Sequence, residues 1–155
     1  MTDLYLGLDP AAANCGWAVL DKSGILKGKG TFLMKSNKWE STSMRPFRLR
    51  AFLRDVFETF PGIVACGFED ALNHKNPAAT KLYGEMRFVI HDNCKENAVP
   101  VVGCNVKEIK VHATGHGGAS KEKMMAAAKG QWDQEFTEDE ADAAWVADLL
   151  REGKA

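Results

Sequence analysis

Hydrophobic and polar residues alternate along the chain in patterns that predict five strands. Short apolar or alternating runs that end at turn residues are typical of strands. The runs that fit this pattern are residues 4–9, 16–20, 25–33, 63–68 and 99–104. Because turn residues separate the first three runs at short intervals, we expect three consecutive strands joined by short loops.

Apolar residues at helical spacing predict helices in the remaining segments. Residues 44–60 form one amphipathic stretch, which Pro61-Gly62 ends, and Pro77 lies where the first turn of another helix should begin. Shorter helices are expected at 106–113 and 120–129. The last helix should start at Thr137, because Thr137 and Glu140 have the spacing of a capping box.

The order of these elements predicts an α/β fold. Three strands, a helix, a strand, a helix, a strand and then helices describe a mixed five-stranded sheet with helices packed on both faces. At 155 residues the chain can bury a sufficient core without disulfides or a structural metal ion. We therefore expect a single domain over residues 1–155.

Composition narrows the class of protein. No apolar run approaches the roughly 20 residues that a membrane-spanning helix requires, and the N-terminus lacks the basic segment of a signal peptide. A cytoplasmic protein is expected. The four cysteines lack Cys-x-x-Cys spacing, which favours reduced and buried thiols.

Charge is segregated along the chain although its net value is only −1. Nearly all charged residues from Lys22 to Arg54 are basic, whereas acidic residues predominate from Asp133 to Glu152. A basic surface that faces phosphates and an acidic cluster that holds metal would produce this pattern, and so would ordinary solvated surface charge.

Four carboxylates are the candidate catalytic residues. Asp9 and Glu69 end two apolar strands, and the ends of neighbouring strands face a crevice. Asp139 and Asp142 are three residues apart in the last helix, so they share one face. A helix that crosses the strand ends would bring all four together.

Such a cluster favours divalent metal chemistry. Four neighbouring carboxylates repel one another unless cations compensate them. Oxygen ligands suit Mg²⁺ or Mn²⁺, and two ions about 3.5–4 Å apart can ionise an attacking water and stabilise a departing 3′ oxygen. The expected reaction is hydrolysis of a phosphodiester bond without a covalent intermediate.

Three motifs around these acids carry a resemblance to a known family. They are LGLDP followed by GWAV (residues 6–10 and 16–19), GFE (67–69) and DEADA (139–143). Over nearly its full length the chain resembles the RuvC family of Holliday-junction resolvases. The resemblance implies an RNase H-like fold, a crossover junction endodeoxyribonuclease that acts on four-way and other branched DNA, and metal binding by Asp9, Glu69, Asp139 and Asp142.

The segment between the second and third acids also resembles the family. Lys110 and Lys121 match its two active-site lysines, on either side of a glycine turn at residues 115–118. A lysine beside metal ions can neutralise charge that develops on phosphorus, and the amides of a glycine turn before a helix can bind phosphate. His116 in this turn could contact phosphate or only cap the turn.

Further DNA contacts are expected beside the second acid. Many relatives carry a base-stacking aromatic residue three positions after that acid, where this chain has Leu72, so we expect weaker sequence discrimination and wider tolerance of branched substrates. The loop after Asp9 also departs from the family, since Ala11 replaces the usual glycine. The candidate DNA-contact residues are Leu72, Asn73, His74, Lys75, Asn76, Lys107 and His116.

A homodimer is implied by the same resemblance. Asn76, Gly84 and Arg87 match positions on the central helix of the family, so the helix from Asn76 to Asn93 is expected to lie at the dimer interface. A twofold dimer offers two active sites to a nearly symmetric four-way junction.

Two alternative functions remain open. The first is a ribonuclease H, which cuts RNA in hybrids with DNA and uses a similar cluster of acidic residues. The second is a module that binds junctions without cutting them. A proofreading exonuclease is less favoured because it requires Asp-x-Glu on the first strand. An actin-like ATPase would need a second nucleotide-binding lobe, for which this chain is too short.

Overall fold

A single mixed sheet organises the protein, whose computed structural model describes residues 2–34, 38–71 and 76–155. Within the described residues the strand order is β3-β2-β1-β4-β5. The strands are β1 (Leu4–Pro10), β2 (Asn14–Asp21), β3 (Leu26–Leu33), β4 (Ile63–Asp70) and β5 (Val101–Asn105). The first three strands are antiparallel, whereas β4 runs parallel to both β1 and β5.

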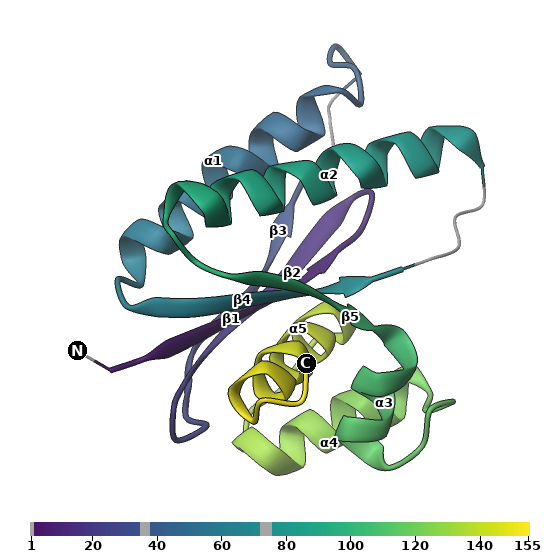
Figure 1. Cartoon of the computed structure of the whole chain (residues 1–155). Helices are drawn as coiled ribbons and strands as arrows, with labels where there is room; N and C mark the ends of the chain where they lie inside the picture. Colours follow the sequence, from purple (N-terminus) through teal and green to yellow (C-terminus); the bar gives the residue numbers. More distant parts are fainter. Residues whose placement is uncertain (1, 35–37, 72–75) are drawn as a thin grey trace.

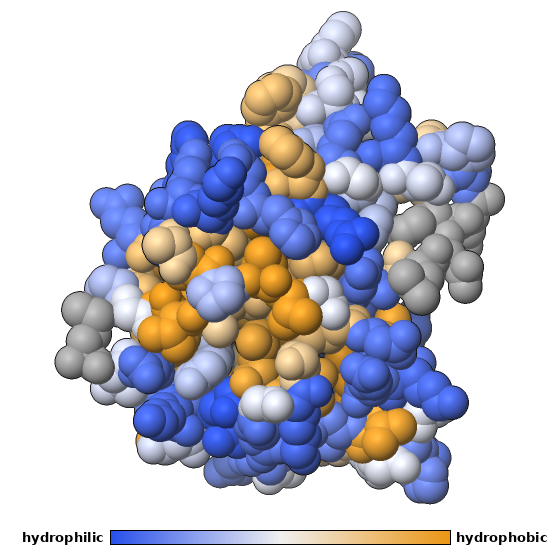
Figure 2. Space-filling view, in the orientation of Figure 1, coloured by the Kyte–Doolittle hydropathy of each residue, from blue (hydrophilic) through white to orange (hydrophobic). Residues whose placement is uncertain are grey.

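Helices cover both faces of this sheet, as the sequence predicts. They are α1 (Met44–Thr59), α2 (Pro77–Glu96), α3 (Val106–Thr114), α4 (Lys121–Trp132) and α5 (Glu138–Arg151). Figure 1 shows α1 and α2 together on one face, and α5 on the other face with α3 and α4 beside it. Between the two helical layers, where β5 forms an edge of the sheet, the surface is hydrophobic (Figure 2).

Two hydrophobic clusters lie on the two sides of the sheet. One joins the strand residues Leu6, Leu8 and Phe68 to α1 and α2, and the other joins α5 to α3 and α4. Helix α5 is buried almost all round, mainly through alanines, and this is the pattern of a helix enclosed by the rest of its domain. Its alanines allow it to approach the sheet closely.

The helices begin within one residue of their predicted starts, and two of them extend three residues beyond their predicted ends. The capping box of Thr137 and Glu140 is confirmed. The predicted end of the second helix at residue 93 is wrong, because α2 continues to Glu96. Ala98 then has a positive φ of 55°, which stops the helix, so β5 starts at Val101 rather than at residue 99. Helix α4 likewise passes the predicted end at residue 129 and stops before Asp133, at a φ of 53°.

The cysteine prediction is also confirmed, since all four side chains are buried and free of disulfides. In the described parts of the chain, no helix combines the length and the apolar character that crossing a membrane requires.

Candidate active site

Strand pairing brings the first two acids to one edge of the sheet. β1 and β4 are parallel neighbours, with Leu8 opposite Phe68, so the residues that follow, Asp9 and Glu69, lie side by side near the C-terminal ends of the two strands. Asp9 is only 6% exposed, whereas Glu69 is half-buried. The expected meeting of two strand-end carboxylates is therefore present in the fold.

Glycines let α5 lie directly on these strands. A Cβ atom on Gly7 would lie 2.0 Å from the carbonyl oxygen of Ala143, and one on Gly16 would lie 2.2 Å from that of Asp139. Gly67, which pairs with Gly7 across β1 and β4, faces the same helix. No other residue type fits such backbone-to-backbone contact, so these glycines determine how near the acids of α5 come to Asp9.

Three of the four predicted acids converge. Carboxylate oxygens of Asp9, Glu69 and Asp142 all lie within 4.8 Å of one another, close enough to share a cation. Asp139 lies outside this group but lines the same cleft of ≈ 360 Å³, together with Glu138. The cleft is open to solvent at its rim and acidic at its base.

Burial and mutual repulsion raise the pKa values of this cluster. Burial raises the pKa of Asp9 well above its usual range, and the neighbouring Glu69 raises it further. Burial and then the charges of Glu69, Glu138 and Asp139 raise the pKa of Asp142 to about 7. Near neutral pH the cluster therefore holds protons unless a cation replaces them, and three carboxylates at this spacing fit a hard divalent ion.

No family model matches the chain, but known proteins with similar sequences are named as endodeoxyribonucleases. The crossover junction endodeoxyribonuclease RuvC of Methylobacillus flagellatus is 25% identical over 134 residues, which are 83% of this chain and 74% of that protein. RuvC of Ehrlichia canis is 26% identical over 144 residues, 92% of either chain.

A solved structure adds the fold. Thermus thermophilus RuvC in complex with a Holliday junction substrate superposes with a TM-score of 0.82, over 99% of this chain and 98% of that one, at 21% identity. The resemblance to the RuvC family is confirmed. The RNase H-like fold that this resemblance implied is confirmed as well.

The two lysines that match the RuvC family take different places around the cleft. Lys110, on α3, lies close enough to Asp142 that its charge opposes the rise in the pKa of that carboxyl. Lys121, at the start of α4, is 71% exposed and its Nζ lies 3.2 Å from Oε1 of Glu138. That hydrogen bond raises the pKa of Lys121.

The candidate DNA contacts are only partly placed. Lys107 lines a different cleft from that of Asp9, Glu69 and Asp142, together with His112 and Lys154. His116 is exposed in the glycine turn, where its backbone N–H donates to Thr114 Oγ1. Asn76 caps α2 by accepting a hydrogen bond from the N–H of Ala79. The remaining four, Leu72, Asn73, His74 and Lys75, lie outside the described residues.

Two further residues near the site, Glu138 and Tyr83, are not predicted from the sequence. Glu138 is a fifth acid of the cleft, and its place in the first turn of α5 beside a capping box was the available signal. Tyr83 contacts the end of β4, where its hydroxyl lies 2.9 Å from Asp70 Oδ1 and 3.2 Å from the carbonyl oxygen of Glu69. No signal marked Tyr83, because it occupies an ordinary apolar position of α2.

Proposed function

We propose that this chain is a divalent-metal-dependent endonuclease that cuts four-way DNA junctions and other branched DNA. The observation that carries the proposal is the convergence of Asp9, Glu69 and Asp142 within 4.8 Å in an open cleft. The relatives of similar length are named as crossover junction endodeoxyribonucleases, and the structural neighbour was solved with a Holliday junction.

The acids would hold Mg²⁺ or Mn²⁺, two ions per site, with Asp139 completing the set. A bound pair of such ions supplies an ionised water and stabilises the departing 3′ oxygen. The chain itself fixes the ligand oxygens, because Asp9 and Glu69 are strand ends and Asp142 belongs to a helix packed on those strands. Preorganised oxygens avoid the cost of collecting four repelling charges during each turnover.

The lysines would act on the phosphate. Lys110, beside Asp142, is placed to offset negative charge that develops on the scissile phosphorus. Lys121 can exchange its partner Glu138 for a phosphate oxygen, since it is largely exposed. The backbone amides of the glycine turn and the N-terminus of α4 would bind a neighbouring phosphate.

The test is cleavage of a synthetic four-way junction by the purified full chain. With Mg²⁺ we expect paired nicks near the crossover on a denaturing gel, and none in EDTA. Asp142→Asn should bind the junction in a gel shift but not cut it, because phosphate contacts come largely from basic side chains. Asp55→Asn, an exposed carboxylate on α1, is the matched control and should cut normally.

Two outcomes would contradict the proposal. Junction binding without nicks at any concentration of Mg²⁺ or Mn²⁺ would favour a binding module. Faster cleavage of an RNA/DNA hybrid than of the junction would favour a ribonuclease H, which is why the hybrid belongs in the same assay. Cleavage across a set of junction sequences would also measure the weak sequence discrimination expected from Leu72.

We also propose that the chain forms a homodimer through α1 and α2. Phe47 and Phe88 are each 64% exposed on this face, and a cleft of ≈ 620 Å³ lies between the two helices, lined by both rings. Hydrophobic side chains interrupt the hydrophilic surface over these helices (Figure 2). Large exposed apolar groups that share one face are typical of an interface.

Light scattering on the purified chain tests the dimer. The wild type should have the mass of two chains, and Phe88→Glu should have the mass of one, because two buried glutamates would face each other across a twofold axis. Ile25→Glu, at another exposed apolar residue, should stay dimeric. A wild-type monomer at micromolar concentration would rule the interface out. The expected cytoplasmic location remains a prediction.

A further inference from the structure

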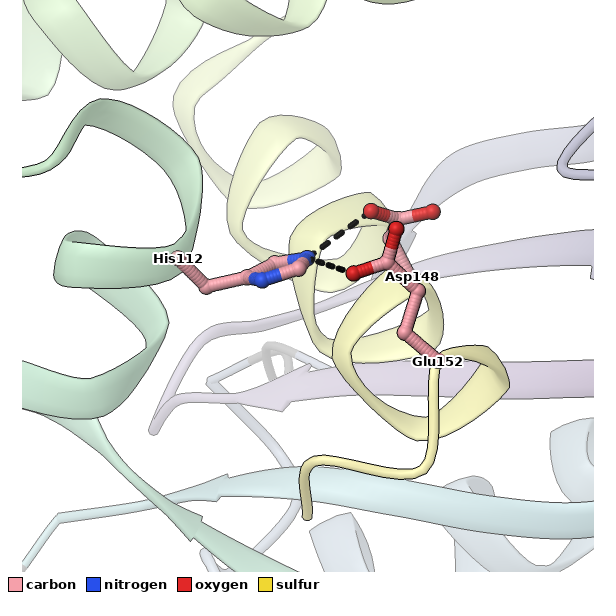
Figure 3. Close-up of side chains that lie close together, drawn as sticks. All are labelled: His112, Asp148 and Glu152. Carbon is pink, nitrogen blue, oxygen red and sulfur yellow. Dashed lines mark hydrogen bonds and ion pairs between the residues drawn. The ribbon is translucent and has the colours of Figure 1, made fainter.

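A polar cluster outside the acidic cleft joins α3 to the end of α5. In Figure 3 the imidazole of His112 extends from α3 toward Asp148 and Glu152. Its Nε2 lies 2.8 Å from Oδ2 of Asp148 and 3.7 Å from Oε2 of Glu152. The side chains of His112 and Asp148 are only 8% and 5% exposed, so their hydrogen bond is sheltered from water.

Neighbouring groups hold both partners in place. Arg151 donates to Oδ1 of Asp148 from Nε at 3.0 Å and from Nη2 at 2.7 Å, which leaves Oδ2 for His112. The ring of His112 also meets Trp145 edge-on, with centroids 5.8 Å apart. The imidazole is therefore fixed by a ring on one side and by a clamped carboxylate on the other.

Helix α3 is short and contributes few buried side chains, so a buried hydrogen bond is a large share of what fixes its orientation on α5. It has nine residues, too few to be stable as an isolated helix, and Ile109 is its one fully buried side chain. Within the described residues, the bond of His112 to Asp148 and the longer approach of His112 to Glu152 are the side-chain hydrogen bonds and ion pairs that run from α3 to α5.

We propose that His112 is a positioning residue, which locks α3 against α5 and so places Lys110 beside Asp142; this inference rests on the proposed function. Lys110 and His112 belong to the same short helix, and Asp142 and Asp148 belong to the same long one. The hydrogen bond of His112 to Asp148 and the electrostatic approach of Lys110 to Asp142 thus join one pair of rigid elements at two places. One link is structural, and the other reaches the catalytic cleft.

The geometry of a helix makes this coupling strong. A rotation of α3 by about 20° about its axis would move a side-chain tip that lies about 6 Å from the axis by about 2 Å. A misplacement of about 1 Å in a catalytic group can slow a reaction by about 100-fold. A buried, directional hydrogen bond resists such rotation better than apolar contacts, which tolerate sliding.

A cation in this cluster is less favoured. The oxygens and nitrogen of His112, Asp148 and Glu152 do lie within 4.8 Å of one another. However, Arg151 already pairs with both carboxylates, and Lys154 approaches Glu152 at 3.2 Å. The two negative charges are compensated by side chains of the protein, unlike those of the acidic cleft.

Two variants of the full chain separate the hydrogen bond from the bulk of the ring. His112→Gln keeps an amide donor near the place of Nε2, and His112→Leu keeps a similar volume without the donor. In single-turnover cleavage of a four-way junction, the leucine variant should be about 10- to 100-fold slower with an unchanged junction Kd. The glutamine variant should remain within about 3-fold of the wild type.

A double-mutant cycle shows whether the effect passes through Lys110. In a Lys110→Ala background, followed for hours with enzyme in excess, His112→Leu should slow cleavage by less than about 2-fold more. If it slows that background as much as it slows the wild type, His112 does not act through Lys110. If His112→Leu cuts as fast as the wild type, the positioning role is wrong.

Amide hydrogen exchange tests the lock without any cleavage. The leucine variant should exchange faster across α3 than the wild type, while the glutamine variant and the amides of α2 keep their protection. Unchanged exchange in α3 would refute the lock even in an active enzyme. If the exchange of the variants differs as expected but the wild type cuts no junction, the proposed function is refuted and the lock between α3 and α5 still holds.

Discussion

Replacing Asp142 by asparagine should stabilise the metal-free protein near pH 8 while it abolishes cleavage. The reason is that Asp142 is costly to ionise in the fold, since burial and three neighbouring acids raise its pKa to about 7 from an ordinary value of 3.8. An asparagine of nearly the same shape carries no charge. The substitution therefore removes repulsion that a bound cation would otherwise relieve.

The sign follows from proton linkage. The carboxyl of Asp142 loses its proton near pH 3.8 in the unfolded chain and near pH 7 in the fold. Between these values the unfolded state is the more ionised, so the free energy of unfolding decreases as the pH rises from about 4 to 7. The raised pKa of Asp9 acts in the same direction. The asparagine variant should show a smaller decrease.

The size can be worked out from the same shift. About three pKa units at 1.36 kcal/mol each correspond to roughly 4 kcal/mol. Solvent at the rim of the cleft screens part of this repulsion, and the amide of the new asparagine needs hydrogen-bond partners. We therefore expect Asp142→Asn to raise the free energy of unfolding by about 2 kcal/mol. For a chain of 155 residues that raises Tm by about 4–8 °C.

Thermal unfolding followed by circular dichroism measures it in EDTA, near pH 8 and near pH 4. The stabilisation should appear near pH 8 and vanish near pH 4, and saturating Mg²⁺ should favour the wild type instead. Asp21→Ala is the control, because this buried carboxylate accepts ordinary bonds from the N–H groups of Ser23 and Ile25; it should be less stable at both pH values. Equal Tm values for wild type and Asp142→Asn near pH 8 would refute the repulsion argument.

Three further predictions concern the elements around the cleft. In urea titrations, Gly7→Ala should lower the free energy of unfolding by about 2–3 kcal/mol, because a Cβ atom there would meet the backbone of α5. Gly130→Ala, in open space on α4, should raise that free energy by up to about 1 kcal/mol. Equal effects of the two substitutions would contradict the close packing of α5 on the strands. Thr137→Ala should cost about 1 kcal/mol in the same titration, because it removes the cap of α5, and no change would discount the cap. Glu138→Gln should free Lys121 and tighten junction binding in a gel shift while cleavage persists; loss of cleavage would make Glu138 a metal ligand.

Much of the fold could be predicted because buried residues are apolar and recur at the period of a strand or a helix. The five strands and five helices of the described residues were expected from apolar spacing and turn residues, and Thr137 marked the start of α5 correctly. The misplaced ends have local causes. Asn93 looks like a terminal residue, yet it is buried within α2, where its side chain donates to the carbonyl of Val89, and Ala98 takes the turn conformation.

The candidate site was predictable as a set of residue types but not as a geometry. Spacing placed Asp9 and Glu69 at strand ends, and the resemblance to the RuvC family supplied the lysines. Nothing in the sequence showed that Asp139 stands apart from the converging three. The bond between His112 and Asp148 joins residues 36 positions apart, and no local pattern in the sequence marks a pairing at that separation.

The glycines beneath α5 change what a signature for this kind of site should contain. Acidic residues at these spacings occur by chance in many proteins, so a sequence search that used the carboxylates alone would find many unrelated proteins. Gly7, Gly16 and Gly67 bind nothing, yet they decide whether the last helix can descend far enough for its acids to reach the strands. A transfer of this centre to another scaffold must therefore include these three glycines as well as the acidic residues.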